Sequence, residues 1–286
     1  MAVCNVCFRH CSIDDGNLGF CRARSSKDGH VYPINYGRVT SLALDPIEKK
    51  PLNRFYPGSK ILSVGSFGCN LRCPFCQNSE ISWDDQVDRW QKTADSLSPK
   101  ELSDIAKECV GRGNIGVAFT YNEPLIGYEY VRDTAKLIHE MGLKNVLVTN
   151  GTATKEVYEE LADLIDAMNI DLKGFNTHYY SDILKGDLDM VLEMIESAVT
   201  RCHVELTTLI IPGENDSEEE MRQISTWISK LTDASGNTIG QDIPLHISRF
   251  FPCFHMTDRA ATDVSKIYRL ADIAREKLKY VYTGNC

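Results

Sequence analysis

Short apolar segments alternate with helical patterns along residues 60–278, and this alternation restricts the fold more than any other feature. Strands separated by helices pair in parallel, and the helices cross over the sheet. Six such units predict an α/β fold that fits a barrel better than an open doubly wound sheet, with the site at the carboxyl ends of the strands. The strand-like segments are 60–66, 114–120, 144–149, 168–172, 204–211 and 244–250.

Capping residues mark where the helices begin. Ser98 and Glu101 form a capping-box pattern with Pro99 in the first turn, and Ser217 and Glu220 repeat the pattern. We expect helices over 98–111, 124–141, 154–167, 177–184, 187–201, 217–231 and 262–278, and a last short strand at 280–283.

Three regions of the chain differ in composition. Residues 1–24 are rich in cysteine and lack helical or strand periodicity, whereas residues 25–58 carry four prolines among scattered β-formers. We therefore expect a Cys-rich metal-binding segment at 1–24, an extended connecting segment at 25–58 and a barrel at 59–286.

Composition and charge restrict the partners of the chain. The net charge of −9, with dispersed basic residues, argues against a nucleic-acid partner. No apolar run reaches the length of a membrane span and the first residues lack a signal peptide's apolar core, so we expect a cytoplasmic protein without a membrane partner. In that reducing compartment, eleven cysteines indicate metal binding or catalysis rather than disulfides.

Three of these cysteines follow the first predicted strand. Cys69, Cys73 and Cys76 have the spacing C-x3-C-x2-C, one ligand short of a closed metal site. Three thiolates can hold a [4Fe-4S] cluster and leave one iron open to an exchangeable ligand, whereas zinc sites usually show paired C-x2-C knuckles. The spacing therefore predicts an iron–sulfur cluster with one open coordination position.

Polar residues end the other predicted strands as well. Each group has a simple structural explanation when taken alone, such as a turn at 150–151. Their joint placement on one rim favours a functional site. The groups lie at 120–124, 149–151, 171–173, 212–213 and 246–249.

Four further cysteines lie near the N-terminus. Cys4, Cys7, Cys11 and Cys21 form the pattern C-x2-C-x3-C-x9-C, which satisfies either zinc or a second [4Fe-4S] cluster. Zinc is favoured, because a short glycine-rich segment without its own core commonly depends on a metal for its fold. His10 is either a substitute ligand or a surface residue.

The cysteine motif at 69–76, with the aromatic Phe75 before its last cysteine, resembles the signature of the radical S-adenosylmethionine (radical SAM) superfamily. Similarity to the pyruvate formate-lyase activating-enzyme branch extends over most of residues 60–255, through TNGT (149–152), DLKGFN (171–176), IIPGENDS (210–217) and PLH (244–246). A closer resemblance, to the AmmeMemoRadiSam subgroup, covers nearly the whole chain through the N-terminal cysteines, DPIEKKPL (45–52), GCNLRCPFCQN, TYNEP, SRFFP (248–252) and YVYTGNC (280–286).

This resemblance implies a partial (β/α)6 TIM-like barrel and an oxidoreductase. In such enzymes the amino and carboxylate groups of SAM chelate the open iron, and one electron from the reduced cluster cleaves the sulfonium C–S bond. The resulting 5′-deoxyadenosyl radical abstracts a hydrogen atom from the substrate, while the protein orients the reactants. A one-electron donor such as flavodoxin or ferredoxin is implied as a partner.

The resemblance also implies roles for residues at the strand ends. Glu123 stands at the acid of a Gly-Gly-Glu motif, written Tyr-Asn-Glu here, and would receive the amino group of SAM without the backbone contacts of the two glycines. Val148 replaces an Asp that holds a monovalent cation in some relatives, so no cation site is expected. The other residues expected to contact SAM, its ribose or its carboxylate are Phe75, Asn78, Asn150, Asp171, Lys173, His246 and Arg249.

Three functions remain open at this point. The first is a radical SAM enzyme with a protein substrate, as in glycyl-radical activation. The second is a radical SAM enzyme that modifies a small molecule in a pocket lined by residues such as Tyr121 and Arg249. The third is a non-enzymatic iron–sulfur or zinc protein for electron transfer or scaffolding, which would not need the acid, lysine and histidine at the strand ends.

Overall fold

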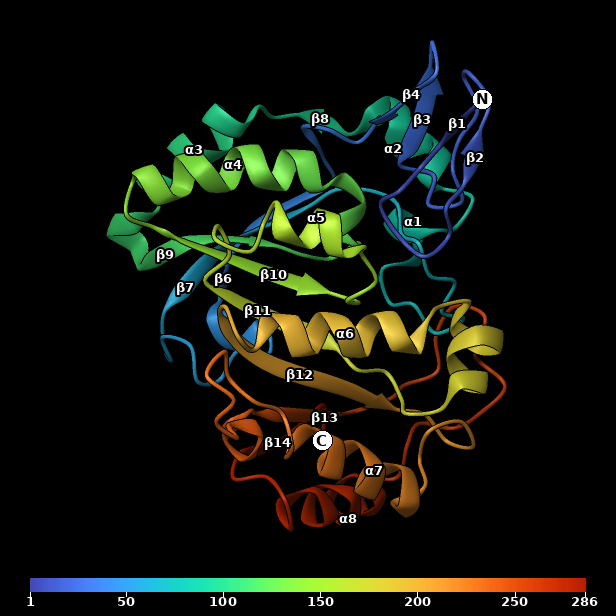
Figure 1. The fold of residues 1–286 in the computed structure, drawn as a ribbon, viewed down its shortest axis with the longest axis vertical. Coiled ribbons are helices and arrows are strands. Elements are labelled where there is room, and N and C mark those ends of the chain that lie inside the picture. The colour runs from blue at the N-terminus through green and yellow to red at the C-terminus, as the bar shows by residue number, and fades with distance from the viewer.

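One eight-stranded sheet forms the centre of the computed structural model, which describes all 286 residues (Figure 1). Seven strands are parallel and run in the order β14-β13-β12-β11-β10-β9-β7, and β6 pairs antiparallel with β7 at one edge. Because β6 and β14 do not pair with each other, the barrel is partial, and the predicted α/β class is confirmed. The strands are β6 (Ser41–Pro46), β7 (Lys60–Gly65), β9 (Asn114–Phe119), β10 (Lys144–Thr149), β11 (Ala167–Asp171), β12 (His203–Ile210), β13 (Leu245–Arg249) and β14 (Val281–Gly284).

Helices connect the successive parallel strands and cover one face of the sheet. The largest apolar core lies between this face and the helices, where Leu147 and Ile170 of the sheet share one cluster with Val131 and Ile195 of the helices. The connecting helices are α3 (Pro99–Glu108), α4 (Tyr128–Glu140), α5 (Lys155–Glu159), α6 (Leu188–Ala198), α7 (Glu218–Ile228) and α8 (Val264–Arg275). None of the helices combines the length and the apolar content that crossing a membrane requires.

The other face of the sheet lines the interior of the barrel, and residues 47–55 close its amino-terminal end. Successive side chains of a strand point to opposite faces, so alternate residues such as Ser63 and Gly65 of β7 belong to this interior. A separate buried cluster forms its floor from Ile47, Leu52, Phe55, Ile61, Ala118, Val146 and Ala167.

Residues 41–55, within the segment expected to be a connector (25–58), are therefore part of the barrel. Its second half forms β6 and the floor, although β6 shows no clear alternation because both of its faces are partly exposed. Residues 1–33 form two small antiparallel pairs, and the turn at Asp28 and Gly29 takes the positive φ angles (51° and 78°) of a tight hairpin. These strands are β1 (Ala2–Val3), β2 (Ser12–Ile13), β3 (Arg24–Lys27) and β4 (His30–Pro33).

Most helices form where their capping residues and apolar periodicity predict them, and tertiary contacts change the caps of some. The capping box of α3 is complete, with Ser98 and Glu101 bonding each other's backbone amides. At α7, Ser217 caps the helix as expected, but Glu220 Oε1 accepts a hydrogen bond from the Phe175 amide (2.7 Å) instead of closing the box. Four further elements were not predicted: β5 (Arg38–Val39), α1 (Ser79–Ser82), α2 (Val87–Thr93) and β8 (Asp95–Ser96). The remaining elements are the short helices η1 (Ile47–Lys49), η2 (Val110–Arg112), η3 (Pro124–Gly127), the π-helix η4 (Tyr179–Leu184) and η5 (Gly240–Asp242).

Candidate functional site

Cys69, Cys73 and Cys76 lie on the loop between β7 and α1, at the carboxyl ends of the strands. Cys73 is buried, and Cys69 and Cys76 are partly buried. Cys69 Sγ accepts a hydrogen bond from the Leu71 amide (3.4 Å) and lies 3.7 Å from Asn150 Nδ2, a second donor. Such donors stabilise negative charge on a sulfur ligand of an iron–sulfur cluster.

One pocket is lined by the three cysteines and by most of the predicted SAM-binding residues. It has a volume of about 370 Å³ and opens at the carboxyl ends of β9 to β13. Three thiols that line one pocket are the donor set that a [4Fe-4S] cluster with one open iron would take. The predicted residues that line it are Cys69, Cys73, Phe75, Cys76, Asn78, Glu123, Asn150, Asp171 and Lys173.

Glu123 is buried beneath this pocket and holds two strand ends together. Its Oε1 accepts hydrogen bonds from the Leu125 amide (3.0 Å) and Thr149 Oγ1 (2.7 Å), and its Oε2 accepts one from the Asn150 amide (2.8 Å). Burial raises the pKa of Glu123 to about 7 despite these three donors. Two carboxylate oxygens offer about four acceptor positions, so about one remains for an ammonium group.

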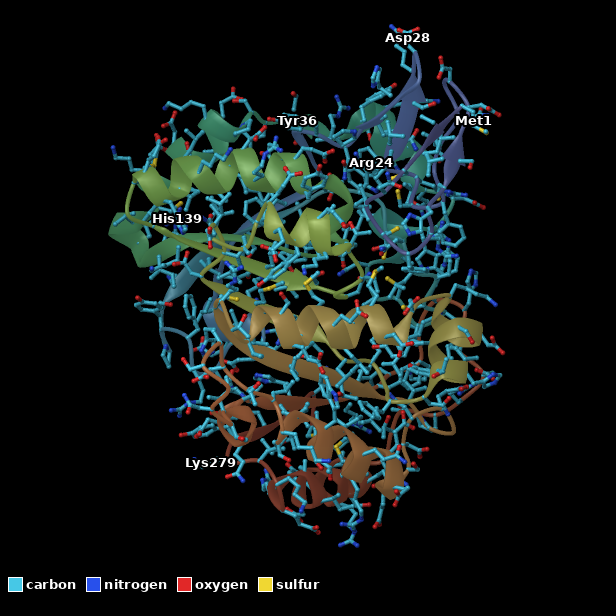
Figure 2. The ribbon with its side chains drawn as sticks, viewed as in Figure 1. Met1, Arg24, Asp28, Tyr36, His139 and Lys279 are labelled. Carbon is cyan, nitrogen blue, oxygen red and sulfur yellow. The ribbon has the colours of Figure 1, made fainter.

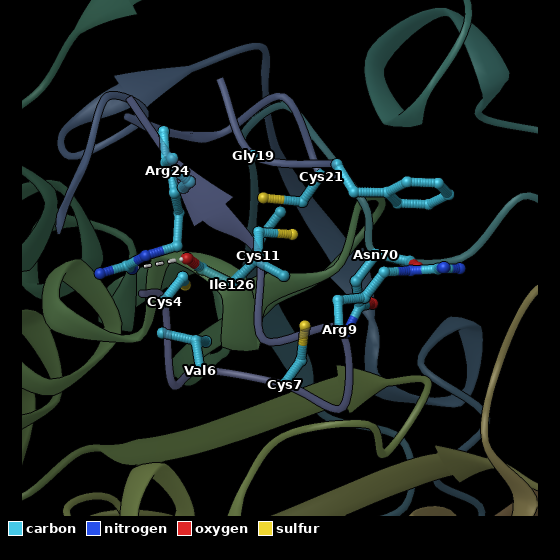
Figure 3. A pocket seen from close by; sticks show the side chains of 12 residues that line it. Cys4, Val6, Cys7, Arg9, Cys11, Gly19, Cys21, Arg24, Asn70 and Ile126 are labelled. Atoms are coloured by element: carbon cyan, nitrogen blue, oxygen red, sulfur yellow. Dashed lines mark hydrogen bonds between the residues drawn. The ribbon is translucent and has the colours of Figure 1, made fainter. Parts of the chain in front are cut away.

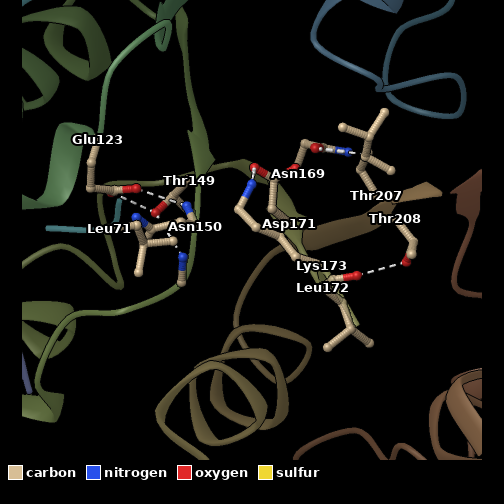
Figure 4. A network of polar contacts seen from close by, with 12 residues as sticks. Leu71, Glu123, Thr149, Asn150, Asn169, Asp171, Leu172, Lys173, Thr207 and Thr208 are labelled. Atoms are coloured by element: carbon tan, nitrogen blue, oxygen red, sulfur yellow. Dashed lines mark hydrogen bonds and ion pairs between the residues drawn. The ribbon is translucent and has the colours of Figure 1, made fainter. Parts of the chain in front are cut away.

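Asn150 directs its side chain toward the cysteine loop. Its Nδ2 donates to Asn70 Oδ1 (2.9 Å), and its Oδ1 accepts from the Thr152 amide (3.0 Å). Figure 4 shows Glu123, Thr149 and Asn150 together at this rim, with Asp171 and Lys173 at the end of the neighbouring strand. Asn150 therefore lines the pocket as predicted, but its amide is already used to position the loop.

Asp171 and Lys173 form an ion pair at the end of β11, with Nζ 2.7 Å from Oδ2. Burial lowers the pKa of Lys173, but the charges of Asp171 and Cys73 outweigh it and raise that pKa. Lys173 therefore stays protonated beside Cys73 and offers a positive charge to an anionic ligand or cluster.

Two predicted residues have other contacts in the cysteine loop. Phe75 is buried and its carbonyl accepts a hydrogen bond from Cys253 Sγ (3.2 Å). Asn78 is exposed at the rim and donates to the Tyr121 carbonyl (2.9 Å), so it connects the loop to the end of β9.

His246, which was predicted to contact the ribose, lies outside the pocket that holds most of the other predicted residues. His246 does not line the pocket; it lies in the barrel below Ser248, and its Nε2 is 2.7 Å from the buried Glu205 Oε2. The ring also stacks on Tyr282 (5.2 Å between centroids). His246 and Ser248 lie on the same face of β13 but at different depths, and only Ser248 lines the pocket. The sequence did not show this difference in depth.

Arg249, which was also predicted to contact SAM, does not line the pocket either. Ser248 faces the pocket, so its neighbour Arg249 points to the opposite face of β13. There Arg249 Nε donates to the Thr262 carbonyl (2.6 Å) and its guanidinium packs over Phe251.

A charged group that was not predicted from the sequence lies on the floor side of the pocket. Lys50 lines the pocket with its side chain almost fully buried, and its Nζ is 2.9 Å from Asp45 Oδ2. Tyr121, at a positive φ of 73°, donates its hydroxyl to the same oxygen (2.9 Å), and Lys50 Nζ lies 4.7 Å from the centre of its ring. Both Asp45 and Lys50 belong to the motif DPIEKKPL, the only sequence signal that could have indicated them.

The N-terminal cysteines surround a second, enclosed pocket (Figure 3). Cys4, Cys7 and Cys21 are buried and Cys11 is partly buried, whereas His10 is exposed and does not line the pocket. Figure 2 shows sulfur atoms gathered beside Arg24, where the N-terminal segment packs on the rest of the molecule. All four thiols of the pattern line one pocket, and their joint role in metal binding stays a prediction.

Comparisons with known proteins agree with this geometry. Residues 63–224 match the Radical SAM superfamily, so the chain belongs to this superfamily. It is 38% identical over 284 residues to the uncharacterized protein MJ0808 of Methanocaldococcus jannaschii, covering 99% of this chain and 80% of that one. It is also 26% identical to the pyruvate formate-lyase-activating enzyme of Clostridium pasteurianum, covering 74% of this chain and 89% of that one, which agrees with the activating-enzyme-like branch.

A solved structure supports the fold. SuiB of Streptococcus suis bound to S-adenosylmethionine aligns with a TM-score of 0.57 at 14% identity, covering 76% of this chain. The chain spans about half (48%) of SuiB, so this likeness concerns the shared barrel alone.

Proposed function

We propose that this protein cleaves S-adenosylmethionine reductively and uses the 5′-deoxyadenosyl radical to abstract hydrogen, as an oxidoreductase of the activating-enzyme type. One observation carries the proposal: Cys69, Cys73 and Cys76 share a pocket with Glu123 and the Asp171–Lys173 pair. A [4Fe-4S] cluster on the three cysteines supplies the electron and the open iron when it is bound.

The surrounding residues of the chain bind and orient SAM in this proposal. Glu123 has about one free acceptor position for the amino group, and Lys173 offers its positive charge to the carboxylate. Asn150 fixes the cysteine loop through Asn70 and keeps its amide near Cys69. The AmmeMemoRadiSam subgroup, the cytoplasmic location and a flavodoxin or ferredoxin donor stay predictions.

A protein substrate is the first choice. The rim residues Lys49, Gln77, Asn78 and Asn285 are exposed, so the pocket opens broadly to solvent, which suits a polypeptide segment reaching into it. The names of several relatives support this choice, because they describe enzymes that activate another enzyme, and one structural neighbour is described with a precursor peptide bound.

A small-molecule substrate is the second candidate, favoured by the polar floor of the pocket. Lys50 and Tyr121 lie inside the barrel, where only a compact ligand or a single extended side chain would reach them. Adding macromolecules and small metabolites separately to the reduced enzyme distinguishes the two. Stimulation of 5′-deoxyadenosine release by the macromolecular fraction alone supports a protein substrate, and stimulation by the small-metabolite fraction alone replaces it.

The central test is anaerobic reconstitution followed by dithionite, SAM and an assay of 5′-deoxyadenosine. We expect the wild-type chain to release it and the Cys73→Ala chain to lose this activity while it stays folded. Cys109→Ala is the matched control, because Cys109 is a buried cysteine at the C-cap of α3 and does not line the pocket. If wild-type protein with a complete cluster forms no 5′-deoxyadenosine, the enzyme proposal fails and the scaffold function replaces it.

The N-terminal cysteines Cys4, Cys7, Cys11 and Cys21 are part of the same proposal as a second metal centre, zinc or a cluster. Their enclosed pocket supports it, because four reduced thiols around one buried space have no other partner that explains their position.

A further inference from the structure

We propose that Lys49 and Lys50 form a subsite on one side of the SAM pocket and that this subsite binds a carboxylate group of the substrate. The subsite belongs to the same pocket, so this inference rests on the proposed function. A carboxylate is the group that an acidic side chain of a polypeptide and a small organic acid have in common, so the subsite fits either candidate substrate.

The two lysines lie on a different side of the pocket from Lys173. Lys49 and Lys50 follow β6, whereas Lys173 follows β11, and the strands β7, β9 and β10 lie between β6 and β11 in the sheet. All three lysines line the same pocket. Because Lys173 is assigned to the carboxylate of SAM, the two lysines that follow β6 remain for a second anion.

The ammonium group of Lys50 has hydrogen-bonding capacity that the protein leaves unused. The side chain is only 4% exposed, and its Nζ has three N–H donors. One donor bonds to Asp45 Oδ2 (2.9 Å), the only acceptor that the protein offers this nitrogen, and the ring of Tyr121 lies 4.7 Å away. At least one N–H of a buried cation therefore lacks an acceptor, which is costly unless a ligand supplies one.

The charges around Lys50 leave a positive excess. Asp45 is the one carboxylate that contacts the two lysines, with Oδ1 3.4 Å from Lys49 Nζ and Oδ2 2.9 Å from Lys50 Nζ. Burial lowers the pKa of Lys50 and Asp45 does not fully offset this effect, whereas nearby charges raise the pKa of Lys173. One uncompensated positive charge matches a single carboxylate better than a doubly charged phosphate.

The position of Tyr121 indicates that this side of the pocket is built for a function. Tyr121 takes a φ of 73°, a left-handed conformation that is rare for a tyrosine. Its ring fills space that Gly65 of β7 leaves free, because a Cβ on Gly65 would lie 2.8 Å from Tyr121 Cδ2. Its hydroxyl donates to Asp45 Oδ2 (2.9 Å), the oxygen that also holds Lys50. Tyr121 and Asp45 thus fix the ammonium of Lys50 at the pocket wall.

The two lysines differ in exposure and therefore in role. Lys49 has a side chain that is 67% exposed, so it attracts an anion from solvent. Lys50 is buried and held in place, so its charged hydrogen bond orients the substrate in the pocket. The subsite is therefore expected to select substrates that carry a carboxylate over the same molecules with an amide in its place.

Equilibrium binding of matched probes to the reconstituted full-length protein, with and without SAM, tests the subsite. The polypeptide probe is acetyl-Gly-Glu-Gly-amide, compared with the same peptide carrying Gln. The small-molecule probe is glutarate, compared with glutaramide. We expect wild-type protein to bind the carboxylate of at least one pair about tenfold more tightly than the amide, the equivalent of one charged hydrogen bond. That pair identifies the source of the carboxylate, and equal binding within both pairs would overturn the proposal.

Three variants test whether the lysines are responsible. Lys50→Met should weaken binding of the preferred carboxylate probe by about tenfold, and Lys49→Gln by about two- to fivefold because its charge is exposed. Lys49→Gln removes only an exposed charge, so it tests the subsite even if Lys50→Met does not fold. Lys100→Gln is the matched control, because Lys100 is also 67% exposed and paired with an aspartate four residues away, but lies on α3 outside the pocket. Carboxylate binding in Lys49→Gln and in folded Lys50→Met as tight as in Lys100→Gln would refute the proposal.

SAM affinity, measured in the same variants, separates a substrate subsite from a SAM contact. Lys49→Gln should bind SAM as tightly as Lys100→Gln does, and a loss of SAM affinity in Lys49→Gln alone would also overturn the proposal. Probe binding does not require SAM cleavage. A protein that prefers carboxylates but forms no 5′-deoxyadenosine would therefore keep the subsite and lose the proposed function, whereas SAM cleavage without this preference would remove only the subsite.

Discussion

The carboxylate of Glu123 accepts a hydrogen bond from the backbone amide of Asn150 at 2.8 Å, and this bond joins the ends of β9 and β10 under the candidate SAM site. One side chain therefore has two tasks: it fixes the rim of the pocket and, in the proposed function, receives the amino group of SAM. Its buried carboxyl has a pKa raised to about 7, so both tasks depend on pH.

We expect the affinity for SAM to rise as pH increases from about 6 to about 8, because the ammonium group needs an ionised Glu123. The free energy of unfolding should change in the opposite direction. The carboxyl ionises near 4.5 in the unfolded chain and near 7 in the folded one, so its contribution is complete below 4.5 and is lost as pH rises through 7.

Glu123→Gln is the control for this titration. The variant should lose both pH dependences and bind SAM more weakly at every pH. Its neutral side chain accepts the Asn150 N–H bond less well than the carboxylate does, which should lower the free energy of unfolding by about 1–3 kcal/mol. Isothermal titration with SAM and urea denaturation measure the two effects. A SAM affinity equal to that of wild type would remove Glu123 from the binding site.

Gly68→Ala is expected to disturb the contact between the two cysteine sites. The new Cβ would lie 2.6 Å from the Cys21 carbonyl oxygen, so the loop must shift in addition to the strain of the positive φ, at a cost of about 1–3 kcal/mol. Gly113→Ala has nearly the same φ (91°) and no atom within 4 Å, so it reports the strain alone. Urea denaturation of both variants should show the larger loss for Gly68→Ala, and equal losses would contradict a tight contact.

Lys50→Met should destabilise the barrel floor, because it removes the buried cation 2.9 Å from the partly buried Asp45 and leaves that carboxylate only the exposed Lys49 at 3.4 Å. Losing one charged partner of this kind costs about 1–3 kcal/mol. Burial opposes ionisation of Asp45, but Lys50 and Tyr121 outweigh it and lower its pKa to about 2. This stabilisation is present above pH 3.8 and is lost as pH falls through 2, so acid unfolding should begin at higher pH in the variant. An unchanged acid transition would show that the pair contributes nothing.

Lys173→Met and Arg249→Ala compare the two faces of the sheet. Lys173 lines the pocket and faces Cys73 and Asp171, so its loss should weaken SAM binding by about tenfold, the equivalent of one charged hydrogen bond. Arg249 points to the helical face, so its alanine variant should bind SAM as wild type does. Equilibrium binding of SAM to the reconstituted proteins measures both, and a loss of affinity in Arg249→Ala would restore it to the site.

Periodicity predicted the parallel strands well because each is a short buried run bounded by a helix. β9 and β10, for example, were expected at 114–120 and 144–149 and are Asn114–Phe119 and Lys144–Thr149. β6 was missed because it is a partly exposed edge strand ending in proline, without the alternation that a one-sided strand shows. The helix expected at 154–167 is only Lys155–Glu159, since the chain turns early to enter β11.

The site was predictable where a motif set both the residue and its position along a strand. The cysteines, Glu123, Asn150 and the Asp171–Lys173 pair meet in one pocket for this reason. His246 and Arg249 lie outside the pocket, and the sequence could not show this, because the residue type reveals neither the face of the strand nor the depth at which a side chain lies. Lys50 was missed because it enters the barrel from a loop rather than from a strand end.

The apolar floor made by residues 47–55 has a kinetic consequence. A barrel sealed at one end gives its reactants a single mouth, so a bulky substrate would cover SAM once it has docked. We therefore expect ordered addition, with SAM first, and release of 5′-deoxyadenosine and methionine only after the substrate leaves. Product-inhibition patterns that show random addition would mean that a second route leads into the barrel.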